Sequence, residues 1–166
     1  ISQVRPFTSV IVKGTVVDDP RILKGGHVIF TITENGSRID CAAYEPTGGF
    51  RETVKRLYCG DVIKAFGGVT ETEKMTVNLE KIEIVDVKEL FELKNPVCPS
   101  CKKRMKSAGR GQGFRCKRCN TTSTQKEKVA VERDLKPRLY CVPARAMRHL
   151  GRPIVEQHLN VQTLKD

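Results

Sequence analysis

Cys98-Pro99-Ser100-Cys101 opens, and Cys116-Lys117-Arg118-Cys119 closes, a short stretch of this 166-residue chain. Two such pairs, fourteen residues apart, supply four thiolates for a tetrahedral site of the kind that structural Zn²⁺ prefers. All four ligand positions are then taken by Cys98, Cys101, Cys116 and Cys119, which leaves none for water and predicts a structural metal rather than a catalytic one. Two disulfides are the alternative. A reducing compartment, indicated by the further free thiols in the chain, disfavours them.

The residues within and between these pairs are strongly basic. Between Cys101 and Cys116 there are six cations and no carboxylate, and two more cations lie inside the second pair. A metal-pinned hairpin of this composition is suited to polyanions. The candidate nucleic-acid contacts in this stretch are Lys102, Lys103, Arg104, Lys106, Arg110, Arg115, Lys117 and Arg118.

Charge divides the chain into two unlike halves. Residues 1–93 carry a net charge of −2 and residues 94–166 carry +13, for a total of +11. Such asymmetry favours nucleic acid or another acidic surface as the partner, although a solvated basic face is the plainer interpretation. No signal peptide and no apolar run of membrane-spanning length is present. We therefore expect a cytoplasmic protein with no membrane partner.

The first half has the pattern of a small β-barrel. Strands are expected over 10–17, 27–33, 38–44, 61–69 and 75–87, with a short helix after the third of them. Asn35-Gly36 is a hairpin signal between the second and third strands. Three strands, a helix and two further strands follow the order of an OB-fold, a five-stranded barrel whose second and third strands carry the ligand. A five-stranded meander in another kind of barrel is the alternative.

Alternation along the strands selects candidate contacts on the barrel. Arg38 and Tyr44 belong to the less apolar face of the third strand, so we expect them to point outward. Phe30 is either a platform on which a base stacks or a core residue, and the sequence leaves both open. Lys13, Phe30, Arg38 and Tyr44 are the candidate nucleic-acid contacts of residues 1–93, the expected OB domain.

The second half is expected to contain a zinc ribbon over 94–142 and a basic tail over 143–166. Strands over 126–132 and 135–142 would complete a three-stranded ribbon. Pro143 opens a short helical stretch whose basic residues recur at the spacing of one helix face, which suits phosphates. These residues are Arg145, Arg148, His149 and Arg152. The fold class is therefore mainly β: a five-stranded OB-fold barrel, a zinc ribbon and a short helical basic tail. No catalytic residues are recognisable.

Three stretches together resemble the C-terminal part of the archaeal isoleucine-tRNA 2-agmatinylcytidine synthetase family. Residues 11–30 look like that family's OB segment, and Cys98-Pro99-x-Cys101 with Cys116-x-x-Cys119 looks like its ribbon. Tyr140-x-Val142-Pro143-x-Arg145-Ala146-x-Arg148-His149-Leu150 looks like its closing motif.

The resemblance implies a tRNA-binding region of an ATP-dependent ligase that conjugates agmatine to the wobble cytidine of the CAU-anticodon isoleucine tRNA. It implies that tRNA and the family's kinase-like and ferredoxin-like catalytic domains are the partners. ATP and agmatine would then bind only in those domains, which are absent from these residues. A single-stranded-DNA-binding protein with an OB barrel and zinc finger is the main alternative, and a ribbon that docks a protein is another.

Overall fold

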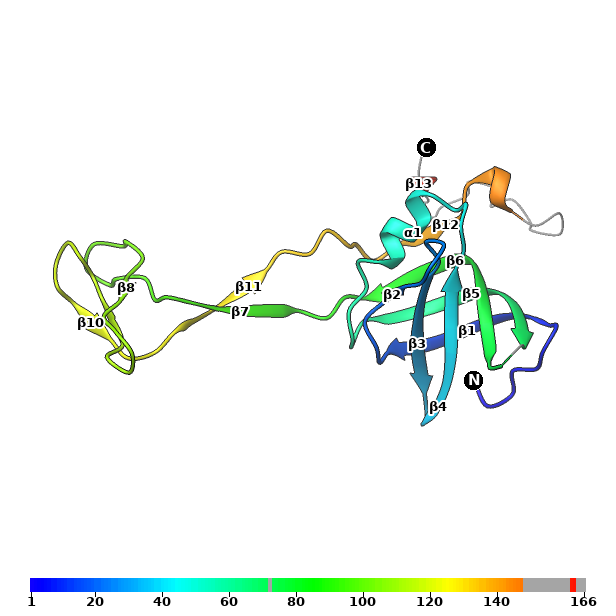
Figure 1. Ribbon diagram of the computed structural model, residues 1–166, viewed down its shortest axis with the longest axis horizontal. Coiled ribbons are helices and arrows are strands. Elements are labelled where there is room, and N and C mark those ends of the chain that lie inside the picture. The colour runs from blue at the N-terminus through cyan, green and yellow to red at the C-terminus, as the bar shows by residue number, and fades with distance from the viewer. Residues whose placement is uncertain (72, 148–161, 164–166) are drawn as a thin grey trace. The chain divides into compact units, whose positions relative to one another are not determined.

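The computed structural model describes residues 1–71, 73–147 and 162–163, which form two compact units (Figure 1). One unit comprises Ile1–Lys88 together with Asp134–Asp166, and the other comprises Glu89–Arg133. The ribbon is thus an insertion in the chain of the barrel unit, because the residues that follow it return to the barrel. The expected boundaries at 93 and 142 differ from this division.

The first unit is a closed five-stranded barrel. Its strands are β1 (Ser9–Val16), β3 (Val28–Glu34), β4 (Ser37–Ala43), β5 (Val62–Glu71) and β6 (Met75–Asp86). They pair in the order β1–β3–β4–β6–β5, and β5 pairs again with β1 to close the barrel. Only the β4–β6 pair is parallel among these five contacts. This strand order, with a short helix between β4 and β5, is that of an OB-fold, as the sequence predicted.

Two glycines allow the strands to close into a barrel. Along β1, residues Ser9 to Thr15 pair with β5, while Thr15 and Val16 pair with β3. A side chain at Gly14 would lie 2.9 Å from the Thr33 carbonyl oxygen, where β1 bends between its two partners. At Gly67 of β5 a side chain would lie 1.9 Å from a backbone carbonyl oxygen of β6, so only glycine fits this approach.

The barrel is filled by inward-facing residues of every strand. Phe30 and Ile32 of β3 are fully buried, as are Phe50 and Val54 of α1 (Gly49–Val54). Figure 1 shows α1 at one end of the barrel.

The carboxylate of Asp61 is also buried in this unit. It accepts backbone hydrogen bonds from Tyr58 (2.8 Å) and Lys88 (2.9 Å). These bonds offset the cost of burying a charged group.

The strand expected over 135–142 belongs to the barrel and not to the ribbon, which corrects the sequence-based assignment. β12 (Leu139–Cys141) pairs antiparallel with β6, with Tyr140 opposite Ile82. β6 is twelve residues long and pairs with β4 only over residues 76–78, so residues 81–83 of the same edge remain free to pair with β12. The small strands β2 (Arg21–Ile22) and β13 (Gln162–Thr163) extend the same sheet, and a 3₁₀ turn, η1 (Ala144–Ala146), follows β12.

The second unit contains two small sheets. β7 (Leu90–Lys94) and β11 (Glu127–Val131) form an antiparallel pair, and β8 (Lys106–Ser107), β9 (Phe114–Arg115) and β10 (Thr122–Ser123) form a three-stranded sheet in the order β10–β9–β8. Sheets this small have little core of their own, so the unit depends on another source of stability. In neither unit do the described residues include a helix long and apolar enough to span a bilayer.

Candidate metal centre and nucleic-acid interface

The first cysteine pair lies in a tight turn. The backbone N–H of Lys102 donates to the Cys98 carbonyl (2.9 Å), and the N–H of Cys98 donates to the Lys103 carbonyl (2.9 Å). Lys102 has a φ of 57°, a left-handed conformation that reverses the chain after Cys101. The turn therefore brings both sulfurs of the pair to one side.

The second pair repeats this geometry. The N–H of Asn120 donates to the Cys116 carbonyl (2.9 Å), the N–H of Cys116 donates to the Thr121 carbonyl (2.8 Å), and Asn120 has the same φ of 57°. Equivalent bonds at equivalent positions make two matching turns out of two sequences that share little except their cysteines. Local backbone geometry, not only cysteine spacing, thus prepares the site.

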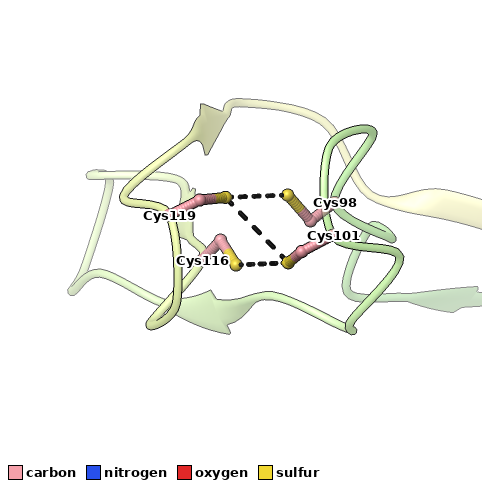
Figure 2. Close-up of side chains that lie close together, drawn as sticks. All are labelled: Cys98, Cys101, Cys116 and Cys119. Atoms are coloured by element: carbon pink, nitrogen blue, oxygen red, sulfur yellow. Dashed lines mark hydrogen bonds between the residues drawn. The ribbon is translucent and has the colours of Figure 1, made fainter.

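The four sulfurs converge, as Figure 2 shows. They all lie within 4.8 Å of one another; Cys98 and Cys119 are 3.3 Å apart, and Cys101 and Cys116 are 3.2 Å apart. In a tetrahedral zinc site with Zn–S bonds of about 2.3 Å, the sulfurs lie about 3.8 Å apart. The sulfur separations here, which run from 3.2 Å to no more than 4.8 Å, bracket that value. None of the four is in a disulfide. Four convergent thiols with no other donor type fit Zn²⁺ and leave no ligand position open, so the metal is structural.

Hydrogen bonds already favour the thiolate form at two of these positions. The backbone N–H of Cys101 lowers the pKa of Cys98 to about 6, and the N–H of Cys119 lowers the pKa of Cys116. Thiolate is the form that binds metal, so the turns assist metal binding at Cys98 and Cys116. At Cys101 the backbone N–H of Lys103 acts in the same direction, but the hydrogen bond with the Cys116 thiol and burial outweigh it and raise the pKa to about 11.

Apolar side chains from the basic hairpin pack behind the metal site. Met105 and Phe114 are buried with Cys98 and Cys116 in a small cluster. The sequence-based prediction treated this stretch only as a basic surface. The sequence does indicate this small core, because Met105 and Phe114 are the two large apolar residues between the cysteine pairs.

A cationic groove of about 420 Å³ runs along the two turns. We call it the ribbon groove; it is lined by Cys116 and by five cations, Lys103, Arg104, Lys106, Lys117 and Arg118. Arg104 donates to the Asn95 carbonyl (2.6 Å) and lies 3.6 Å from a carboxylate oxygen of Glu127. The other four cations form no ion pair within the part of the chain that the structure describes, so they are available to bind an anionic partner.

The remaining predicted contacts of the hairpin lie outside this groove. Lys102, Arg110 and Arg115 are exposed, but none lines the ribbon groove. The structure therefore brings together five of the eight cations that the sequence singled out in this stretch.

The structure places the four predicted contacts of the barrel in different environments. Arg38 is exposed, and Tyr44 is 39% exposed with its ring in edge-on contact with His27 (centroids 5.1 Å apart). Phe30 is fully buried in the barrel core, so it is a core residue and offers no stacking surface. Lys13 is exposed on β1, in a groove with Arg5 that is separate from the one containing Arg38.

A second groove, of about 480 Å³, lies on the outer face of β3 and β4. We call it the barrel groove, and its lining includes Arg38 and the charged residues Asp18, Arg21, Asp40, Glu71 and Lys74. The sequence-based prediction named only Arg38 among these. Asp40 could have been predicted from the sequence, because the two-residue turn at Asn35-Gly36 places Thr31 opposite Asp40, and this is the observed register. The other four residues gave no such signal.

The predicted basic tail lies mostly outside the described residues. Arg145 lies in η1, and its side chain is not described. Arg148, His149 and Arg152 all fall beyond the described part of the chain. Among the described residues, the cysteine quartet is the one group of three or more His, Cys, Asp or Glu side chains arranged to hold a metal.

Comparison with known proteins gives consistent relatives for both units. Residues 95–135 match the family model of the TiaS C-terminal zinc ribbon domain. The chain is 43% identical over 159 residues to the isoleucine-tRNA 2-agmatinylcytidine synthetase TiaS of Archaeoglobus fulgidus, covering 96% of this chain and 37% of the relative. It is 47% identical over 158 residues to the synthetase of the same name from Methanosarcina mazei, covering 95% of this chain and 36% of the relative. The chain thus spans little more than a third of these relatives.

Solved structures of the same synthetase also match this chain. A crystal structure of apo TiaS, an isoleucine-tRNA agmatidine synthetase, matches with a TM-score of 0.80 and 41% identity over 99% of this chain and 40% of that chain. A crystal structure of TiaS in complex with isoleucine tRNA and ATP matches with a TM-score of 0.74 and 41% identity over 96% of this chain and 37% of that chain.

Proposed function

We propose that this chain, which belongs to the isoleucine-tRNA 2-agmatinylcytidine synthetase family as its C-terminal region, holds tRNA for a reaction carried out elsewhere in the whole protein. That reaction is the ATP-dependent conjugation of agmatine to the wobble cytidine of the CAU-anticodon isoleucine tRNA. The observation that carries the proposal is identity of 43–47% running through 95–96% of the chain, across both barrel and ribbon.

The ribbon groove supports a role in holding RNA. Five cations line it and no carboxylate does. A groove of this kind binds backbone phosphates without reading sequence, since phosphate contacts position a nucleic acid while base contacts specify it. Zinc contributes by fixing the two turns that carry Lys103, Lys117 and Arg118.

The chemistry is assigned to the part of the protein that these residues do not include. The relatives are more than twice as long as the matched region. We place the ATP and agmatine sites there, in the kinase-like and ferredoxin-like domains that the family resemblance implies. We place the protein in the cytoplasm, where thiols stay reduced and can bind zinc.

Binding selectivity tests this proposal. The zinc-loaded chain is titrated with the CAU-anticodon isoleucine tRNA, with other tRNAs and with oligo-dT, each at two salt concentrations. We expect tRNA to bind more tightly than oligo-dT and the tRNA affinity to fall steeply with salt. Tighter binding of oligo-dT at both salt concentrations would contradict the proposal and favour a single-stranded-DNA-binding protein.

A further inference from the structure

The barrel groove differs in charge from the ribbon groove. Its charged lining consists of three cations and three carboxylates, Arg21, Arg38, Lys74, Asp18, Asp40 and Glu71. A surface that only grips phosphates gains nothing from carboxylates, because they repel the backbone. The carboxylates therefore need another explanation if this face meets RNA, as the proposed function requires.

Asp40 is a carboxylate of this groove that both a strand and a side-chain hydrogen bond position. It lies in β4 directly opposite Thr31 of β3, and the Thr31 hydroxyl donates to Asp40 Oδ1 at 2.8 Å. Thr31 is only 8% exposed, so this hydrogen bond is sheltered from water. The strand pairing and the hydroxyl together fix the orientation of the Asp40 carboxylate in the groove lining.

A fixed carboxylate selects among bases by the donors that they present. An ionised carboxylate only accepts hydrogen bonds, and it has two oxygens side by side. Guanine carries two adjacent donors, N1–H and N2–H, on its Watson–Crick edge, and that edge is exposed when the base is unpaired. The other three RNA bases offer no such adjacent pair of donors.

We propose that the barrel groove binds an unpaired guanine of RNA, with Asp40 accepting hydrogen bonds from its Watson–Crick edge. Arg38 lies two residues before Asp40 on the same face of β4, roughly 7 Å away along the strand. That spacing puts a cation within reach of the flanking phosphate. The barrel then reads one base while the ribbon grips the backbone, and this inference depends on the RNA binding proposed above.

Short RNAs test the base preference directly. The zinc-loaded chain is titrated with fluorescein-labelled U₈ in which one central residue is replaced by G, A or C. We expect the G oligonucleotide to bind about tenfold more tightly than the A oligonucleotide, as a good bidentate base contact gives. Equal affinities for the G, A and C oligonucleotides would overturn the inference.

Variants assign the preference to Asp40. Asp40→Asn keeps an oxygen that accepts from Thr31 but replaces the second acceptor with a donor, so the G-to-A affinity ratio should fall to within about twofold of unity. Asp86→Asn removes the same charge at the exposed far end of β6 and should leave the ratio unchanged. An unchanged ratio in Asp40→Asn would overturn the inference.

The outcome can be separated from that of the proposed function. Failure of the chain to bind tRNA in preference to oligo-dT would remove the proposed function. Retained tRNA binding with no guanine preference would remove this inference and leave the proposed function standing.

Discussion

The ribbon groove yields a quantitative prediction about salt. Lys117 and Arg118 both line the groove, both are exposed, and both lie between the ligands Cys116 and Cys119. If each contacts one phosphate of a tRNA helix, each contributes about 0.9 to the slope of log K against log salt concentration. The variant Lys117→Ala/Arg118→Ala should therefore lose about 1.8 units of slope. By the same relation, it should bind tRNA about 60-fold more weakly at 0.1 M salt, with the difference vanishing toward 1 M.

Fluorescence anisotropy with labelled isoleucine tRNA, measured from 0.05 to 0.5 M salt, gives both slopes. The control is Lys126→Ala/Lys136→Ala, which removes the same charge at exposed positions that line neither groove. Zinc content is measured for each variant to show that the metal site is intact. A double variant whose line is displaced but parallel to that of the native chain would refute the phosphate contacts.

Four further predictions concern the metal site and the barrel. The variant Cys119→Ser should lose zinc and unfold the unit Glu89–Arg133 while the barrel stays folded. The reason is that metal binding, on the order of 10 kcal/mol, supplies the folding free energy that a larger hydrophobic core would otherwise supply in this unit. Zinc content and amide NMR signals check this. Acidification should release zinc, because protons compete with Zn²⁺ for the four thiolates. In the metal-free ribbon the pKa of Cys98 is lowered from 9.0 to about 6, so the thiolate that favours metal binding is complete above pH 9.0 and is lost as the pH falls through about 6. A colorimetric zinc assay against pH would contradict this if zinc release did not increase on acidification. Tyr44→Ala should weaken RNA binding by about 1–3 kcal/mol if the exposed ring stacks a base, and unchanged affinity in a folded variant would make the ring structural only. Phe30→Ala should lower the free energy of unfolding by about 3–5 kcal/mol, whereas Phe7→Ala, at a residue that is 84% exposed, should change it little; equal urea midpoints would contradict the burial.

Local patterns were enough to predict the β3–β4 hairpin and the metal site. The Asn35-Gly36 turn has φ values of 49° and 81°, as its hairpin type requires, and it fixes the pairing of β3 with β4. The cysteine spacing likewise predicted a site that needs only short-range turns. Both features depend on residues close together in the sequence.

Features that depend on distant parts of the chain were not predictable in the same way. The apolar run at Leu139–Cys141 fits any sheet with a free edge, and only the length of β6 decides that it joins the barrel. An aromatic residue in a strand is expected both on a base-stacking face and in a hydrophobic core, so the sequence could not decide which way Phe30 points. The lining of the barrel groove depends on which segments meet, and Arg21 of the two-residue strand β2 and Lys74 of the loop before β6 lie in segments with no pattern of their own.

Cross-linking to tRNA tests the central claim most directly. The zinc-loaded chain is mixed with isoleucine tRNA containing 4-thiouridine, irradiated and digested, and the cross-linked peptides are identified by mass spectrometry. We expect cross-links in peptides that contain residues 103–106 or 117–118, lost when unmodified tRNA competes. Specific cross-links confined to other peptides, with none at the ribbon groove, would contradict the assignment of tRNA binding to this groove.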